Sequence, residues 1–283
     1  MDPILASSAA AATHKLSPRA RSSTTIAYND PLYSAQWHLA AMDVQGAWEM
    51  GYTGRGVGIL VVDDGLEFDH PDIAPNYRAS GSWDYNRGSP HPTPTNSDDH
   101  GTPAAGLAAA AANNGVCGVG VAHGASLAAV RRFASPVTDA VEAMGVTHGT
   151  TTTLSKSSKR TIENEVVSCS WGPTDDGRRL EGPGPLMALA MYNAAKNGTV
   201  YVWAGGNGRR NGDMCSYDAY AGSRLTVSVG AVDSNDRRTW YSESCPALLI
   251  SAPSGAGGGS SSSAKSGVTT TDLTGYRGLS VGD

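Results

Sequence analysis

The chain has 283 residues, of which 40% are hydrophobic, and a formal net charge of −5. This length and composition allow one large α/β domain, and the charge gives no reason to expect nucleic acid or an anionic membrane as a partner. No run of 18 apolar residues is present, so no membrane-spanning segment is predicted. Residues 1–23 are rich in Ala and Ser and lack the apolar block of a secretory signal, so we expect a disordered leader over residues 1–28.

A short apolar run, Gly58–Val62, is followed directly by Asp63 and Asp64. The run predicts a buried strand, and the ends of parallel strands are where α/β folds place their chemistry. Acids that directly follow a buried strand need a charge partner, a metal or a catalytic role. The alternative is a solvated Asp-Gly turn.

Apolar runs and helix-favouring segments alternate along the rest of the chain. This alternation predicts a single α/β domain over residues 29–283, with a mostly parallel sheet covered by helices on both faces. We expect strands at 58–62, 127–130, 166–171, 199–203, 225–232 and 248–251, helices at 45–51, 104–112, 138–144 and 183–196, an irregular loop at 77–99, an exposed insertion at 148–159 and a flexible loop at 255–263.

Three residues have the chemistry of a serine hydrolase. Asp63 follows a strand, His100 precedes a helix, and Asn207 follows another strand in a Gly-rich segment. A carboxylate can orient an imidazole that takes a proton from a serine, and a side-chain amide can donate to an oxyanion. Taken singly, the histidine is equally typical of a helix cap or surface position, and the asparagine of a turn.

Taken together and in order, the motifs of this chain resemble those of the subtilisin-like serine proteases, specifically the kexin/furin group of proprotein convertases. Any one motif is weak, but the ordered set is specific. The matching segments are Asp30-Pro31, Gln36-Trp37, Gly51–Gly54, Asp63–Gly65, His70–Asp72, His100–Thr102, Asn113–Gly120, Ser170–Pro173, Asp175–Gly177, Asn207-Gly208, Trp240–Glu243 and Thr271–Leu273. The resemblance implies a three-layer subtilisin-like α/β fold that is incomplete at the C-terminus.

The resemblance also implies catalytic roles. Asp63 would be the triad carboxylate, His100 the general base and Asn207 the oxyanion donor. The family nucleophile lies in a Gly-Thr-Ser-Ala segment after the motif Thr271–Leu273, and the sequence ends at Asp283 before such a segment. We therefore expect a fragment of a catalytic domain that lacks the nucleophile.

The convertases cut proteins after paired basic residues, so the implied partners are protein or peptide substrates with basic cleavage sites. Asp175 and Asp218 match the carboxylates that hold the base preceding the scissile bond, and Asp64 matches an acid for the next base upstream. Glu181 matches an acid for a more distant base. The segment Ser170-Trp171-Gly172 matches the family's substrate-binding strand. A carboxylate pair can hold an arginine guanidinium bidentately.

The family binds Ca²⁺, and the resemblance implies two sites. The first would use Asp30, Asp72 and Asn114 with the carbonyl groups of Val116 and Gly118. The second would use Asp175, Asp213 and Glu243. Oxygen ligands of this kind suit a hard cation. A third family site is expected to be lost, because Asp84 is present but Ser89 and His91 stand where acids would be needed.

The four cysteines allow three pairings if all are bridged. The resemblance implies a bridge between Cys215 and Cys245, and a second bridge from Cys117 to a partner beyond Asp283. Cys169 has no family counterpart and is expected to be a buried free thiol. A location in the secretory pathway is implied by the resemblance alone.

Two other functions are compatible with the residues. A shortened pseudo-protease would bind basic peptides without cutting them. An α/β nucleotide-binding protein is suggested by the Gly-rich run at 115–120, but this run lacks the Gly-x-Gly-x-x-Gly spacing after a strand.

Overall fold

The computed structural model describes residues 27–95, 97–132, 137–150, 153–154, 160–161, 163–255 and 267–278. Residues 1–26 of the predicted leader and residues 256–263 of the predicted loop at 255–263 lie outside these residues. The helices are α1 (Trp37–Ala41), α2 (Val44–Glu49), α3 (Gly101–Ala109), α4 (Asp139–Val146) and α5 (Pro185–Lys196), and the strands are β1 (Gly58–Asp63), β2 (Trp83–Asp84), β3 (Ser126–Arg131), β4 (Thr153–Leu154), β5 (Arg160–Thr161), β6 (Val166–Cys169), β7 (Val200–Ala204), β8 (Thr226–Val232) and β9 (Leu248–Pro253).

The main sheet has the order β2-β3-β1-β6-β7-β8-β9 within the described residues, and every neighbouring pair in it is parallel. The connections from β1 to β3, from β3 to β6 and from β6 to β7 pass through α3, α4 and α5. The predicted parallel α/β fold is therefore confirmed. Because the strands are parallel, their carboxyl ends lie at one edge of the sheet.

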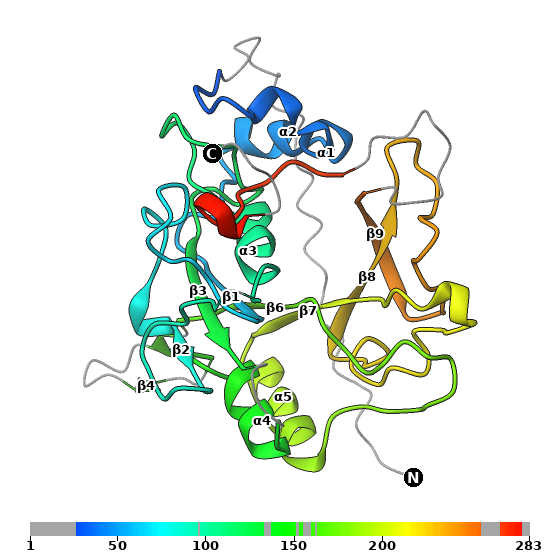
Figure 1. Cartoon of the computed structure of the whole chain (residues 1–283). Helices are drawn as coiled ribbons and strands as arrows, with labels where there is room; N and C mark the ends of the chain where they lie inside the picture. The colour runs from blue at the N-terminus through cyan, green and yellow to red at the C-terminus, as the bar shows by residue number, and fades with distance from the viewer. Residues whose placement is uncertain are drawn as a thin grey trace, which may run out of the picture.

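Helices cover both faces of the sheet (Figure 1). Leu60 and Val62 of β1 pack into a core that includes Met187 and Met191 of α5. Ile59 and Val61 point to the other face, where they join residues of α3. Full burial of each such side chain stabilises the fold by about 2 kcal/mol. Because both faces of β1 are buried, its sequence is a continuous apolar run.

Two predicted segments differ in the structure. The loop predicted at 77–99 contains β2, which pairs with β3, and its Asp84 lies 3.6 Å from the guanidinium of Arg131. The 148–159 segment was predicted to be exposed, but Thr150 is buried and its hydroxyl donates to the carbonyl of Thr147. Residues 153–154 and 160–161 form a two-stranded antiparallel ladder, β4–β5. In the first segment a contact distant in sequence outweighs local polar composition, whereas residues 151–152 and 155–159 of the second lie outside the described residues.

Helix α3 begins at Gly101 and ends at Ala109, whereas the sequence predicted 104–112. The earlier start follows from the Asp64 carboxylate, which accepts the N–H groups of His100 and Gly101 and so satisfies part of the first turn. Ala110 turns to an extended conformation with ψ 144°. Among the described residues, no helix is both long and apolar enough to cross a membrane.

Candidate active site

The carboxyl ends of three adjacent strands bring the predicted site residues to one edge of the sheet. Asp63 ends β1, Ser170 directly follows β6, and Gly205 and Asn207 follow β7. Strand β1 pairs with β6, and β6 with β7. The register of the sheet therefore aligns these segments.

Asp63 and His100 form a direct hydrogen bond. The Nδ1–H group of His100 donates to the two carboxylate oxygens of Asp63, at 2.9 and 3.0 Å. Asp63 is buried, whereas the His100 side chain is 57% exposed. The hydrogen bond to Asp63 raises the pKa of His100 above its ordinary value, and burial acts in the opposite direction. Nδ1 is the protonated nitrogen in this arrangement, so Nε2 can accept a proton from a nucleophile.

Gly101 makes this approach possible. A Cβ atom at Gly101 would overlap the carbonyl oxygen of Gly65 and lie 2.9 Å from the carboxylate of Asp64. Only glycine lets the start of α3 lie this close to the loop after β1. The Gly-after-His pattern in the sequence is thus a packing requirement of the site.

The carboxylate of Asp64 caps α3. Its oxygens accept the N–H groups of His100, at 3.0 Å, and of Gly101, at 2.7 Å. Burial is the main cause that raises the pKa of Asp64. The carboxylate still has acceptor capacity, because two oxygens offer about four lone-pair directions. Its expected role toward a substrate base stays a prediction.

A partly buried ion pair that the sequence reasoning missed anchors the loop before His100. Arg131, at the end of β3, donates to Asp98 from Nε (3.0 Å) and from an Nη (2.7 Å). Asp98 also accepts the N–H and hydroxyl of Thr95. The signal was available in the sequence, because Arg131 directly follows the apolar strand predicted at 127–130, and a buried charge needs a partner.

Three of the predicted metal ligands converge. Ligand oxygens of Asp175, Asp213 and Glu243 all lie within 4.8 Å of one another. Burial, followed by the charges of the two aspartates, raises the pKa of Glu243 to about 7. The donor set fits Ca²⁺, since a hard cation would neutralise carboxylates that otherwise repel one another. The N–H of Asn207 donates to Asp175 at 2.8 Å and that of Gly208 to Glu243 at 2.8 Å, so this acidic group fixes the loop that carries Asn207.

Asp218 lies next to the segment after β6. A Cβ atom at Gly172 would lie 2.8 Å from the Asp218 carboxylate, so only a glycine leaves this carboxylate unobstructed. Burial raises the pKa of Asp218 to about 6, and the charge of Asp175 acts in the same direction. Glu181 forms a bridge with Asp218 through the backbone. Of the sequence-predicted acids, Asp175 thus acts on Asp218 through its charge, and Glu181 is paired with Asp218 through the backbone.

The residues predicted for the first metal site also meet. Asp30 accepts the N–H groups of Asn113 and Asn114, at 2.8 and 3.2 Å. Asn114 donates to Asp72 at 2.9 Å, and Thr271 donates to the other Asp72 oxygen at 2.7 Å. The carboxylates of Asp30 and Asp72 suit Ca²⁺, while the Asn114 amide turns its nitrogen to Asp72. Val116 lies in the same turn, with its N–H on the Asn114 side-chain oxygen, and the backbone of Gly118 packs against the side chain of Gln36.

The cysteine predictions are confirmed where the structure tests them. Cys215 and Cys245 form a disulfide with a sequence separation of 30 residues, and Cys169 is a buried free thiol.

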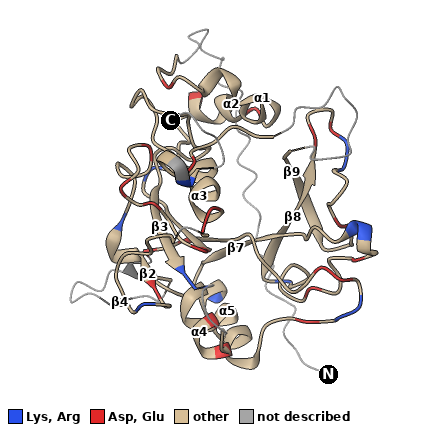
Figure 2. Ribbon diagram, viewed as in Figure 1, with Lys and Arg blue, Asp and Glu red and all other residues tan. Residues whose placement is uncertain are grey.

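The short helical turn Arg209–Asn211, drawn in blue at the right of Figure 2, carries two basic residues. Arg209 donates to the carbonyl of Thr239, and Arg210 stacks over Trp240 at 4.0 Å, so both guanidinium groups have partners outside the acidic group.

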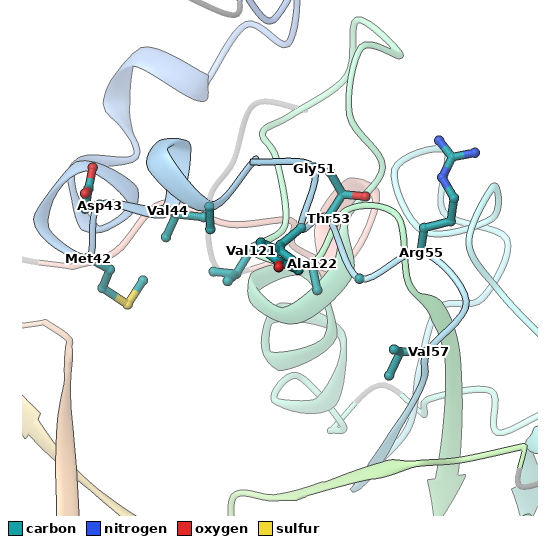
Figure 3. A pocket seen from close by; sticks show the side chains of 12 residues that line it. Met42, Asp43, Val44, Gly51, Thr53, Arg55, Val57, Val121 and Ala122 are labelled. Atoms are coloured by element: carbon teal, nitrogen blue, oxygen red, sulfur yellow. The ribbon is translucent and has the colours of Figure 1, made fainter. Parts of the chain in front are cut away.

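A cavity of about 540 Å³ lies away from these residues, beside α2 (Figure 3). Its lining includes Met42, Val44, Val121 and Ala122. It contains none of the site residues predicted from the sequence. The residues predicted for the chemistry thus lie at the sheet edge and do not line this cavity.

Comparison with known proteins identifies the family of the chain. The model of the subtilase family matches residues 54–280. Proprotein convertase subtilisin/kexin type 7 of Mus musculus is 41% identical over 251 residues, which are 83% of this chain and 31% of the relative. Neuroendocrine convertase 2 of Bos taurus is 39% identical over 268 residues, which are 87% of this chain and 40% of the relative. The chain thus spans between about a third and two fifths of the length of these curated relatives.

Solved structures give the same result. The serine protease of Aeromonas sobria, crystallised with its chaperone, superposes with a TM-score of 0.68 at 25% identity, over 83% of this chain and 45% of that one. A protease from Pseudoalteromonas arctica superposes with a TM-score of 0.67 at 25% identity, over 88% of this chain and 80% of that one. The chain belongs to the subtilase family.

Proposed function

We propose that this chain supplies the aspartate–histidine part of the active site in a calcium-dependent, kexin/furin-type serine endopeptidase that cuts proproteins after paired basic residues. The observation that carries the proposal is the hydrogen bond between Asp63 and His100 at the edge of a parallel sheet. The similarity to proprotein convertases at about 40% identity supports the substrate class.

In the proposed reaction, Nε2 of His100 takes the proton from a serine hydroxyl as the hydroxyl oxygen attacks the scissile carbonyl. Asp63 holds the imidazole in the required tautomer and stabilises the imidazolium that forms. His100 then donates this proton to the leaving amine. By the family motif, the serine is expected in a Gly-Thr-Ser-Ala segment that follows Thr271–Leu273.

Asn207 is proposed as the oxyanion donor. Its side chain is exposed, while its N–H is tied to Asp175. A fixed backbone with a side-chain amide directed to solvent can present a donor to a substrate without reorganisation. Such a donor lowers the barrier by about 3 kcal/mol.

The acids around Gly172 support selection of a basic side chain. Asp218, with a pKa raised to about 6 by burial, gains a partner when a substrate guanidinium or ammonium enters. Asp64 is proposed for the next base upstream. Ca²⁺ would be held by Asp175, Asp213 and Glu243 next to this pocket, and there it would supply the positive charge that balances the three carboxylates.

The decisive experiment uses the protein extended by the coding sequence that follows Asp283. The extended protein is expected to cleave a Lys-Arg peptide, and His100→Ala is expected to lower kcat by about a millionfold. Cleavage that is insensitive to His100→Ala would refute the proposal. A transcript that stops after codon 283 would instead favour the pseudo-protease, which binds basic peptides without cutting them.

The substrate class has its own test. Asp218→Asn should lower kcat/KM for cleavage after arginine. The control is Asp176→Asn, because Asp176 lies on the same loop as Asp175 but pairs with Arg179 at 3.2 Å. Unchanged kinetics of Asp218→Asn on a Lys-Arg peptide would overturn the pocket assignment.

A further inference from the structure

A second, smaller cavity lies beside the candidate active site. It has a volume of about 150 Å³, and its lining includes Arg132, Glu142, Trp171, Gly172, Glu181 and Tyr220. Gly172 and Glu181 are among the residues predicted from the sequence to contact substrate, whereas Arg132, Glu142 and Tyr220 have been given no function. The cavity therefore needs an explanation of its own.

A side chain of the protein itself is packed against this cavity. Arg132 is only 3% exposed, and its guanidinium carbon lies 3.6 Å from the centre of the Trp171 ring. Its Nη1 donates to Glu142 at 3.0 Å. This is the arrangement in which a protein binds a foreign guanidinium, with an aromatic face and a carboxylate. Here both contacts are made by an internal arginine.

Each carboxylate oxygen of Glu142 accepts a hydrogen bond from a side chain of this chain. One oxygen accepts from Arg132, and the other accepts from the hydroxyl of Tyr220 at 2.8 Å. The carboxylate is therefore balanced in charge and engaged at both atoms. Glu181, at the same cavity, is 48% exposed, and its carboxylate lies 3.8 Å from Arg179. The two acids of the cavity each face an arginine of this chain.

The cavity is joined to the site through the segment after β6. The indole N–H of Trp171 donates to the carbonyl of Val62 at 2.9 Å, one residue before Asp63. The N–H of Arg132 donates to the carbonyl of Asp63 at 3.3 Å. Gly172 lines the cavity and also contacts Asp218. A peptide whose basic residue reaches Asp218 would thus pass this cavity with a neighbouring side chain.

We propose that this cavity is a substrate subsite whose selectivity Arg132 sets: it accepts a small uncharged side chain upstream of the basic pair and gives no advantage to an arginine there. The inference rests on the proposed function. Because Arg132 already occupies the Trp171 face and Glu142, an incoming guanidinium would meet a like charge in a partly desolvated space, which disfavours it. Arg132 acts here on specificity and takes no part in the proton transfers.

The test measures the binding of peptides that end at a Lys-Arg pair, which represent released products and cannot be cut. Each upstream position carries Ala or Arg in turn, and binding is measured by calorimetry. With the wild-type protein, arginine at any upstream position is expected to leave Kd within about twofold. In Arg132→Gln, arginine at one upstream position is expected to bind about tenfold more tightly, since Glu142 and Trp171 become available.

The matched control is Arg179→Gln, which removes the same charge from the exposed rim of the cavity. The double variant Arg132→Gln/Glu142→Gln should lose the gain of the single variant. An equal gain in Arg179→Gln and Arg132→Gln would mean a general charge effect and would overturn the proposal. So would a tenfold preference of the wild type for an upstream arginine, an outcome that can be measured even if Arg132→Gln fails to fold.

The test separates the two proposals. If Lys-Arg peptides do not bind, or if they bind equally to Asp218→Asn, the proposed function fails. If they bind through Asp218 and the wild type favours arginine upstream, only the assignment of Arg132 fails.

Discussion

His38 is expected to make the fold sensitive to acid. It lies in α1, is 2% exposed, and neither ring nitrogen has a hydrogen-bond partner among the described residues. Burial lowers its pKa from 6.5 to about 4. The unfolded chain therefore binds a proton at this residue below pH 6.5, while the folded chain does so only near pH 4.

The sign and size follow from this difference. Above pH 6.5 the residue is neutral in both states and does not affect the free energy of unfolding. As the pH falls from 6.5 to 4, stability is lost at up to about 1.4 kcal/mol per pH unit, for a total of about 3 kcal/mol at pH 4. Such a loss is a large fraction of the free energy of unfolding of a folded domain, which is typically about 5–15 kcal/mol.

Urea denaturation between pH 7 and pH 4 gives the free energy of unfolding at each pH. The contribution of His38 is the difference in its pH dependence between the wild type and His38→Phe. The comparison removes the contribution of carboxylates, which both proteins share. The variant should lose about 3 kcal/mol less than the wild type over this range. His91→Phe, which makes the same replacement at an exposed imidazole, is the control for the substitution itself. Parallel curves for the wild type and His38→Phe would refute the reasoning.

Three further predictions concern the site and its supports. Asp63→Asn should lower the pKa of His100, as followed by NMR titration of the imidazole protons, because the hydrogen bond to the carboxylate raises it. Reduction of the Cys215–Cys245 disulfide, which closes a loop of 30 residues, should lower the free energy of unfolding by about 3–4 kcal/mol in urea titrations. Addition of Ca²⁺ should raise Tm, by an amount equivalent to about 2.7 kcal/mol at 100 times Kd, and Asp213→Asn should diminish this shift; an unchanged Tm would count against the second metal site.

The main elements could be predicted because their signals are local. The apolar run of β1 and the proline-to-glycine pattern around α5 identify a strand and a helix without reference to the rest of the chain. The pairing of Cys215 with Cys245 could not be derived from four cysteines, and came from the resemblance to the convertases.

Contacts between distant segments account for what was missed. Strand β2 pairs with β3, and its Asp84 is buried beside Arg131, 47 positions later in the sequence. The Gly, Pro, Ser and Asn residues of the surrounding segment favoured a loop, and this distant contact could not be seen in the sequence. The pairing of Arg132 with Trp171 depends in the same way on how β3 and β6 flank β1. Two consecutive arginines after an apolar strand were a visible sign of buried charge, but their partners could be found only in three dimensions.

The cap that Asp64 forms on α3 makes this residue a point of thermodynamic linkage. Its charge also contributes to the raised pKa of His100. Any cation that binds Asp64 would therefore lower the proton affinity of His100, and a proton on His100 would weaken binding of that cation by the same factor. Occupancy and protonation at this edge of the sheet are then two variables of one equilibrium, so the apparent pKa of His100 reports whether a cation is bound at Asp64.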